Sequence, residues 1–398
     1  MNIAVRPPPD GSGVSTAIAE SIADFVSLRH ELHRKPELAF AERATTAKII
    51  DLLQGWGYRV AQLTRTGVIA TLENGPGPVL GLRADIDALP IAEATGLSYA
   101  SAVPGVMHAC GHDGHTVILL AAARYLARSR NFQGTLRLIF QPAEEIGAGA
   151  RALIEAGLFD RFPVDAIFGL HNWPGVEAGR LGFVEGPAMA AVDKIGARFV
   201  GKGGHGAEPH LAVDPVVASA HAITALQSVV SRNVDPLQMA VVTVGSIHGG
   251  QASNVIPGEV DLQLTLRSYA PEVRELLKKR IPALFDQVAK SFGAEVRVDL
   301  HHGFPSVVNS SAETRLIRQI AEDSLGTDAV IADFAPRTAS EDFAYYLHHR
   351  PGSFIFVGNG DSAPLHSPEY RFNDDIIAPA ATLWASLAER FLNGDTHE

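Results

Sequence analysis

The sequence of 398 residues contains one cysteine, no excess of positive charge and no long apolar run. The single cysteine, Cys110, excludes a disulfide within the chain and favours a reducing compartment such as the cytoplasm. A formal net charge of −11 argues against a nucleic acid partner, because surfaces that bind nucleic acid are basic, and mildly against an anionic membrane surface. No apolar stretch approaches the roughly 20 residues that span a bilayer. We therefore expect partners other than nucleic acid or membrane.

The first residues of the sequence are not expected to be a secretory signal. Residues 1–13 are rich in proline and glycine, contain one arginine and have no apolar core of the kind that a secretory signal needs. We expect these residues to form a flexible tail. The rest of the sequence shows no internal repeat and no low-complexity tract.

The overall composition is that of a globular protein, with 46% hydrophobic and 19% charged residues. Because 398 residues exceed the usual size of a single core, we expect two domains. Apolar runs alternate with segments of helical periodicity, such as residues 16–32 and 116–127. The runs lie at residues 68–72, 79–82, 136–140 and 166–170. Buried strands that alternate with helices predict an α/β fold with a mostly parallel sheet flanked by helices.

A different pattern occupies residues 186–302. Its expected elements are a strand at 192–200, a helix at 214–231, strands at 240–247 and 259–266, a helix at 271–289 and a strand at 295–300. This βαββαβ order is that of a ferredoxin-like unit, which is complete in itself. Helix and strand patterns then resume at residues 313–324, 341–347, 353–357 and 376–391. We therefore expect a discontinuous domain of residues 14–185 and 303–398, interrupted by an inserted domain of residues 186–302.

Polar side chains follow three of the expected strands at the point where each strand ends. Arg83, Asp85 and Asp87 follow the first, Glu144 and Glu145 the second, and His171 and Asn172 the third. In open α/β sheets, ligands bind in the crevice outside the carboxyl ends of the strands. These three polar groups are therefore expected to converge in one crevice.

The segment from His108 to His115 is the richest in metal-binding side chains. Its eight residues include one cysteine, three histidines and one aspartate. A thiolate and an imidazole two residues apart, at Cys110 and His112, suit a divalent metal such as zinc, and the helix that follows favours the thiolate form. Two simpler interpretations remain open: a lone cysteine is usually a small buried apolar side chain, and the segment could be a structural loop.

Two further candidates are ambiguous by themselves. Adjacent carboxylates such as Glu144 and Glu145 are usually a solvated surface pair, but here they directly follow an apolar strand and Pro142. Neighbouring side chains point differently, so that one can bind metal while the other handles a proton, as metal-assisted hydrolysis requires. His366 follows a glycine-rich loop and by itself would be interpreted as an exposed loop histidine.

Taken together, these motifs resemble the M20 family of metallopeptidases. The similarity is strongest to the branch that contains hippurate hydrolases, bacterial N-acyl-amino-acid amidohydrolases and plant auxin-conjugate hydrolases. It covers nearly the whole chain, is highly specific for the family and is weakly specific for the substrate. The motifs are His33-Arg-Lys-Pro36-Glu37, Arg83-Ala-Asp85-Ile-Asp87-Ala-Leu-Pro90, His108-Ala-Cys110-Gly-His112-Asp113-Gly-His115, Gln141-Pro-Ala-Glu144-Glu145, Gly203-Gly-His205 and Ser253-Asn254-Val-Ile-Pro257.

The resemblance implies a centre with two divalent metal ions, which would be zinc, manganese, nickel or cobalt. The positions that match metal ligands of the family are Cys110, His112, Glu145, His171 and His366, with Cys110 at the bridging position. Glu144 matches the general base that deprotonates the attacking water, and Asp87 matches a carboxylate that orients the ligands. No ligand position departs from the family pattern.

The resemblance also assigns roles within the inserted domain. His205, among several glycines, matches a histidine that crosses a dimer interface and stabilises the oxyanion in the partner's site. Asn254 and Arg267 match positions that hold the free carboxylate of the substrate, a group that suits a guanidinium. Arg267 could instead be a solvated residue near the end of a strand. The resemblance thus implies a homodimer or a higher homo-oligomer.

The function that these expectations favour is hydrolysis of the amide bond of N-acyl amino acids, such as N-acetyl or N-benzoyl compounds, to a carboxylic acid and a free amino acid. One alternative is a dipeptidase or carboxypeptidase of the same fold, but Cys110 favours the first interpretation because peptidase members usually carry aspartate at that position. A second alternative is a metal-dependent binding protein without turnover.

Overall fold

The structure is a computed structural model that describes residues 13–394. The predicted tail therefore lies outside the described residues, apart from Gly13, where helix α1 begins. The chain forms two compact units. Unit 1 comprises the chain up to Ala188, Val308–Ala335 and the chain from Asp342 onward, and unit 2 comprises Met189–Val307 and Pro336–Glu341.

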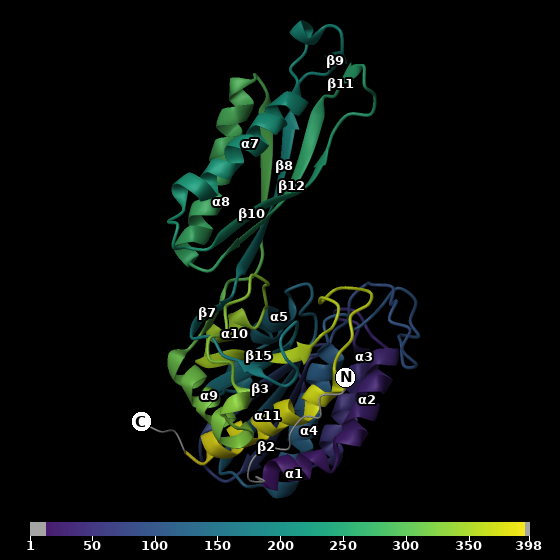
Figure 1. Cartoon of the computed structure of the whole chain (residues 1–398), viewed down its shortest axis with the longest axis vertical. Coiled ribbons are helices and arrows are strands. Elements are labelled where there is room, and N and C mark those ends of the chain that lie inside the picture. The colour runs from purple at the N-terminus through teal and green to yellow at the C-terminus, as the bar shows by residue number, and fades with distance from the viewer. Residues whose placement is uncertain (1–12, 395–398) are drawn as a thin grey trace. The chain divides into compact units, whose positions relative to one another are not determined.

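Unit 1 is built on a sheet of seven strands with a parallel centre (Figure 1). The four central strands are parallel to one another, and the outer strands pair antiparallel with them or with each other. The predicted α/β fold with a mostly parallel sheet is thus confirmed. In spatial order the strands are β1 (Arg59–Gln62), β2 (Val68–Asn74), β4 (Gly134–Gln141), β3 (Val79–Asp85), β5 (Ala166–Pro174), β15 (Gly352–Gly360) and β6 (Leu181–Gly182).

Helices cover both faces of this sheet. Helix α4 is buried almost all round, because it packs on the sheet, on α2 and on α11 (Figure 1). The helices that share one large apolar core with α4 (His112–Ser129) are α1 (Gly13–Ala19), α2 (Ile22–Arg34), α3 (Arg43–Gly55), α9 (Ser311–Leu325) and α11 (Ile377–Leu392). The opposite face carries the shorter helices α5 (Gly149–Glu155), α6 (Leu158–Arg161) and α10 (Ala344–Leu347). Of the helices within residues 13–394, none has the length and apolar composition needed to cross a membrane.

Two predicted helices of unit 1 differ from the structure. The expected helix at residues 16–32 is divided into α1 and α2, and the hydroxyl of Ser21 donates a hydrogen bond of 3.1 Å to the carbonyl of Ile18 at the break. The expected helix at residues 341–347 is only the short α10, because the carboxylate of Asp342 instead accepts hydrogen bonds from buried Arg83 and Gln141. Both differences involve side-chain hydrogen bonds, which the periodicity of apolar residues does not reveal.

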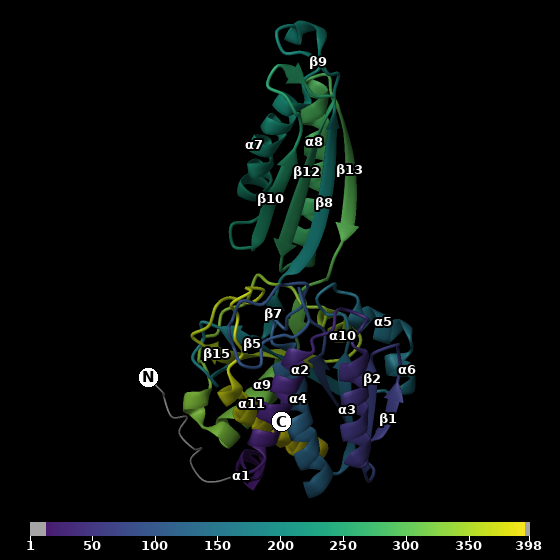
Figure 2. The same cartoon turned by 90° about the vertical axis from the view of Figure 1, so that its right-hand side faces the viewer.

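Unit 2 contains a four-stranded antiparallel sheet in the order β10-β12-β8-β13. Figure 2 shows helices α7 and α8 on one face of this sheet, where they enclose a second apolar core. The elements follow the predicted βαββαβ order. They are β8 (Ala191–Val200), α7 (Pro215–Asn233), β10 (Ala240–His248), β12 (Glu259–Ser268), α8 (Pro271–Ser291) and β13 (Glu295–His302).

Unit 2 also includes a short segment that the sequence placed in the first domain. The backbone amide of Ala190 donates to the carbonyls of Arg337 and Ala339, at 3.2 and 2.9 Å, which ties residues 336–341 to unit 2. No helical or strand pattern marks this segment, so only tertiary hydrogen bonds reveal where it belongs. The remaining short elements are β7 (Gly186–Met189) paired with β14 (Val307–Asn309), β9 (Gly204–His205) paired with β11 (Val255–Ile256), and the 3₁₀ turns η1 (Pro209–Leu211), η2 (Thr327–Ala329) and η3 (Asp374–Ile376).

Candidate metal centre

The carboxyl ends of the central strands of unit 1 lie at one edge of the sheet, because these strands are parallel. Glu144 and Glu145 follow the end of β4, and His171 lies on β5. His366 follows β15, and His112 is the first residue of α4. The topology of the sheet therefore delivers all of these side chains to the same edge.

The five predicted ligands meet there in overlapping groups. The side-chain donor atoms lie within 4.8 Å of one another in each of three sets, which are Cys110 with His112 and His171, Cys110 with Glu145 and His366, and His112 with Glu144 and Glu145. Cys110, His112 and Glu145 each belong to two of these sets, so the three sets overlap in one cluster. The structure thus brings together the five predicted ligands and the predicted base.

Two of the imidazoles are held so that Nε2 faces the cluster. His112 Nδ1 lies 2.9 Å from the carbonyl oxygen of Asp87, and His171 Nδ1 lies 2.6 Å from that of Asn172. A carbonyl accepts only from a protonated nitrogen, so these contacts leave the Nε2 lone pairs for a ligand. On the cluster side, His171 Nε2 lies 3.3 Å from Cys110 Sγ.

Two orphaned polar atoms test whether these residues fit a metal pair. His112 Nε2 and Glu145 Oε1 are buried, lie 3.9 Å apart and have no hydrogen-bond partner among residues 13–394. A buried polar atom without a partner destabilises the fold, whereas a cation between the two atoms would satisfy both. A thiolate, three imidazoles and a carboxylate are also a donor set that binds zinc and related divalent ions. The residues fit the implied metals.

The electrostatic surroundings of the cluster agree with this fit. Burial and the charges of Asp87 and Asp85 together raise the pKa of Glu145 to about 7, against the lowering effect of His112. Burial lowers the pKa of His171 well below its usual value, so that this imidazole is neutral, the form that binds metal. For His112, burial lowers the pKa, but the charges of Asp85, Glu145 and Asp87 and a hydrogen bond to Asp87 together raise it to about 10, so metal binding there must release a proton.

The other metal-type side chains of the segment from His108 to His115 are used differently. His115 donates from Nδ1 to Asp85 at 2.6 Å and accepts at Nε2 from the backbone amide of Asn172 at 3.0 Å, so both of its nitrogens are occupied. Asp113 faces away from the cluster and pairs with Arg29 and His33 on α2. His108 is buried, and its ring nitrogens lack hydrogen-bond partners within the described chain.

Sequence reasoning missed a hydrogen-bonded support behind Cys110. The Asn172 amide donates to the carbonyl of Cys110 at 2.7 Å, and the Tyr370 hydroxyl donates to Asn172 at 2.7 Å. The backbone amide of His366 donates to the carbonyl of Ala109 at 2.8 Å. These bonds fasten the C-terminal segment to the cysteine loop. The position of Asn172 next to His171 was the only signal of this support in the sequence.

The predicted residues of unit 2 lie in two separate places. His205 and Asn254 are neighbours at the β9–β11 pair, where the amide of Gly206 donates to the carbonyl of Asn254 at 2.8 Å. Arg267 lies near the far end of β12, where its guanidinium donates to Thr338 and to Ser340. The strand from Glu259 to Arg267 spans roughly 26 Å, so the structure does not bring Arg267 to the other two.

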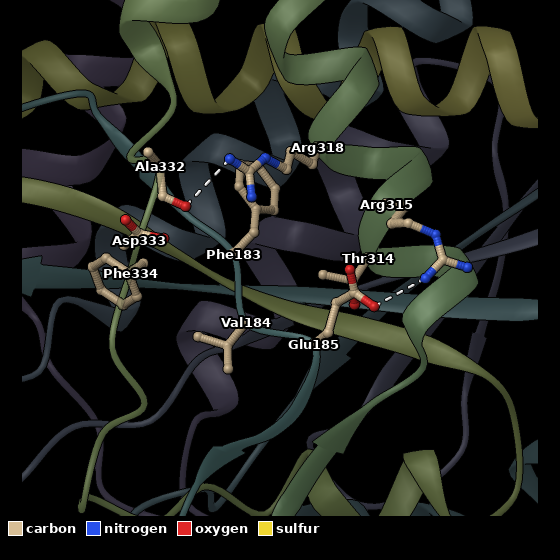
Figure 3. A pocket seen from close by; sticks show the side chains of 9 residues that line it. All are labelled: Phe183, Val184, Glu185, Thr314, Arg315, Arg318, Ala332, Asp333 and Phe334. Atoms are coloured by element: carbon tan, nitrogen blue, oxygen red, sulfur yellow. Dashed lines mark hydrogen bonds and ion pairs between the residues drawn. The ribbon is translucent and has the colours of Figure 1, made fainter.

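A separate hollow of about 250 Å³ opens on unit 1 and contains none of the predicted site residues (Figure 3). Its two arginines are already paired, since Arg315 contacts Glu185 at 3.0 Å and Arg318 donates to the carbonyl of Ala332 at 3.3 Å. Phe183, Val184, Thr314, Asp333 and Phe334 complete its lining. The hollow therefore does not compete with the cluster as the candidate site.

Comparisons with known proteins agree with the geometry. An N-acetyl-L-cysteine deacetylase of Bacillus subtilis is 44% identical over 374 residues, which cover 93% of this chain and 89% of the relative. A hippurate hydrolase of Campylobacter jejuni is 39% identical, over 93% of this chain and 97% of the relative. A solved Bacillus subtilis structure described as a dinuclear metal binding peptidase from the M20 family is 34% identical, with a TM-score of 0.81 over 95% of this chain and all of the other. Residues 81–390 match peptidase family M20/M25/M40, and the chain belongs to that family, which confirms the resemblance predicted from the motifs.

Proposed function

We propose that the chain is a metal-dependent amidohydrolase that cleaves the amide bond of N-acyl amino acids and releases a carboxylic acid and a free amino acid. The observation that carries this proposal is the meeting of five metal-type donors with a further carboxylate, Glu144, at the carboxyl edge of a parallel sheet. Family membership supports it, as do two relatives that are named as a deacetylase and a hippurate hydrolase.

In this proposal Cys110, His112, Glu145, His171 and His366 hold two divalent cations, which are zinc, manganese, nickel or cobalt. When bound, such a pair polarises a carbonyl oxygen and makes a water molecule more acidic. Asp87 orients His112, because its carbonyl and its carboxylate both lie within hydrogen-bond distance of His112 Nδ1, at 2.9 and 3.2 Å.

Glu144 moves the proton. Glu144 is only 6% exposed and lies beside the cluster, so little solvent competes there. In the proposed reaction a carboxylate oxygen of Glu144 accepts a proton from the attacking water and then delivers it to the amide nitrogen, which leaves as an amine. Only one group is then needed to remove the proton and to return it.

Unit 2 supplies the remaining proposed roles. His205 stabilises the oxyanion, and Asn254 and Arg267 hold the free carboxylate of the substrate. Because His205 and Arg267 lie at opposite ends of unit 2, they serve one substrate only if they come from different chains. This separation supports the homodimer that the family resemblance implies. A reducing compartment such as the cytoplasm would preserve the Cys110 thiolate.

The alternative is a dipeptidase or carboxypeptidase of the same fold, and a panel of substrates separates the two. N-acetyl amino acids, N-benzoyl amino acids and dipeptides are incubated with protein loaded with zinc, manganese, nickel or cobalt, and the free amino acid is measured. The proposal predicts turnover of N-acyl amino acids that exceeds turnover of dipeptides. Preference for dipeptides would support the alternative, and no product with any metal would point to a binding protein.

A further inference from the structure

In the turn that carries Glu144, the residue directly before it, Ala143, has an unfavourable backbone conformation. Strand β4 ends at Gln141, and Ala143 has a φ of 56°, in the left-handed region that residues other than glycine rarely adopt. Ala143 is fully buried. A strained conformation persists only where the surroundings hold it, so some group must hold Ala143.

Glu42, far away in the sequence, provides that hold. Its Oε1 accepts a hydrogen bond of 3.0 Å from the backbone amide of Ala143 and one of 2.9 Å from the amide of Phe40. The Glu42 side chain is fully buried. One buried carboxylate oxygen therefore joins the loop before α3 to the turn after β4.

An acidic residue directly before a helix usually caps the N-terminus of that helix, but a different side chain does so for α3. Glu42 immediately precedes α3 but makes no side-chain hydrogen bond to the start of that helix. The carboxylate of Glu37 accepts instead from the amides of Ala44 and Thr45, at 3.0 and 2.9 Å. Stabilisation of α3 therefore does not explain the orientation of the Glu42 carboxylate.

A second carboxylate holds the other side of the turn. Asp87 Oδ2 accepts a hydrogen bond of 3.0 Å from the backbone amide of Glu145. The turn is closed by the amide of Gly147, which donates to the carbonyl of Glu144 at 2.7 Å. The amides directly before and after Glu144 are thus both fixed by buried carboxylates, so the backbone of Glu144 has little freedom to move.

We infer that Glu42 is a positioning residue that holds the backbone of the Glu144 turn in its strained conformation. It acts through Ala143, because its carboxylate oxygen Oε1 accepts from the backbone amides of Ala143 and Phe40 and belongs to none of the sets of metal-type donors. The inference rests on the proposed function in one respect, namely that Glu144 carries the proton. Loss of the hydrogen bond would let Ala143 relax and displace Glu144 from the reacting atoms.

Two substitutions of similar size separate the hydrogen bond from the charge. Glu42→Gln retains an oxygen acceptor for the Ala143 amide, whereas Glu42→Met removes it. We expect Glu42→Met to lower kcat roughly 10- to 100-fold, as a misplacement of about 1 Å does, with KM within about threefold of wild type. Glu42→Gln should restore kcat to within about threefold of wild type. If Glu42→Met does not fold, Glu42→Asp, whose carboxylate is one methylene shorter, takes its place.

Glu37→Met is the matched control, because it removes hydrogen bonds to the start of α3 without touching Ala143. We expect this variant to melt at a lower temperature with kcat unchanged when it is assayed well below that temperature. An equal loss of kcat in Glu42→Gln and Glu42→Met, or in Glu37→Met and Glu42→Met, would overturn the inference.

Hydrogen exchange of the peptide that covers residues 141–150 tests the inference without any substrate. The amide of Ala143 should exchange faster in Glu42→Met and as slowly as wild type in Glu42→Gln. Unchanged protection in Glu42→Met would overturn the positioning role even if the enzyme is active. If wild type hydrolyses no substrate but the exchange pattern is as expected, the proposed function fails while the hold on the turn stands.

Discussion

Glu144 and Glu145 are adjacent in the chain but differ in their contacts. Glu145 Oε2 lies 3.3 Å from His366 Nε2, and Glu145 belongs with Cys110 and His366 to a set of metal-type donors. Glu144 shares one set with His112 and Glu145 and another with Glu341 and Asp342, but none with Cys110 or His366. The backbone explains the difference, because successive side chains on a tight turn point in different directions. The turn therefore fits the proposed division of roles, in which Glu145 binds metal and Glu144 carries the proton.

At this scale the first prediction concerns Glu144. Replacement by alanine removes the proposed proton carrier, so kcat should fall by about 100-fold or more, while the five donors remain to bind metal. Steady-state kinetics and the metal content of the purified variant check both parts. Turnover close to that of wild type would show that another group is the base.

His205 is predicted to affect the transition state more than substrate binding. Its replacement by alanine should lower kcat about 100-fold, the loss typical of one oxyanion donor, with a smaller change in KM. Kinetics with an N-acetyl amino acid measure both constants. A change confined to KM would contradict the oxyanion role.

His33 is predicted to make stability depend on pH. Burial lowers its pKa, but the charge of Asp113 and hydrogen bonds to Asp113 and Glu93 outweigh burial and raise it to about 9 from an ordinary 6.5. The fold therefore stabilises the protonated form of His33. This contribution to the free energy of unfolding is fully present below pH 6.5 and is lost as the pH rises from 6.5 to about 9. Urea unfolding of wild type and His33→Gln should show a stability difference that shrinks over this range; a constant difference would refute the linkage.

At the scale of elements, helix α7 has a clear N-terminal signal. Asp214 Oδ1 accepts from the amides of Val216 and Val217 at 2.8 and 3.3 Å, and Pro215 is the first helical residue. We predict that Asp214→Ala lowers the free energy of unfolding of unit 2 by about 1 kcal/mol, while Asp214→Asn, which keeps an acceptor oxygen, changes it less. Chemical denaturation of the two variants tests this, and equal losses would show that the cap is not the cause.

Elements with strong periodicity were predicted well, and elements determined by side-chain hydrogen bonds were not. Helices α7 and α8 begin and end within two residues of the expected ranges, because their apolar positions recur at helical spacing. The break between α1 and α2 and the short α10 depend on the hydroxyl of Ser21 and the carboxylate of Asp342. Hydropathy carries no information about the partners of such groups.

At the scale of the whole molecule, bound metal is predicted to stabilise the fold of unit 1. The proposed ligands come from the start of α4, the turn after β4, strand β5 and the segment after β15, so metal would cross-link distant parts of the chain. At a free metal concentration of 100 Kd, one site adds about 2.7 kcal/mol. Chelation should lower Tm, and added zinc should restore it, with a smaller shift in His366→Ala. A melting temperature unaffected by chelation would contradict metal binding at this site.

The sequence by itself determined the family, the α/β class, the βαββαβ order of unit 2 and the identity of the side chains that meet at the donor cluster. These features follow from periodicity and from motifs in which chemically specific residues are close together in the chain, such as Cys110 and His112. They were predictable because local spacing encodes them.

Only the tertiary structure decided which neighbours support the cluster. Nothing in the spacing of His108, Asp113 and His115 separates them from the proposed ligands, but the fold turns Asp113 toward Arg29 and His115 toward Asp85. Glu42 reaches Ala143 across 101 residues of sequence. The physical reason is that a buried polar group must find a partner wherever folding places one, and that partner is set by the arrangement of strands and helices rather than by distance along the chain.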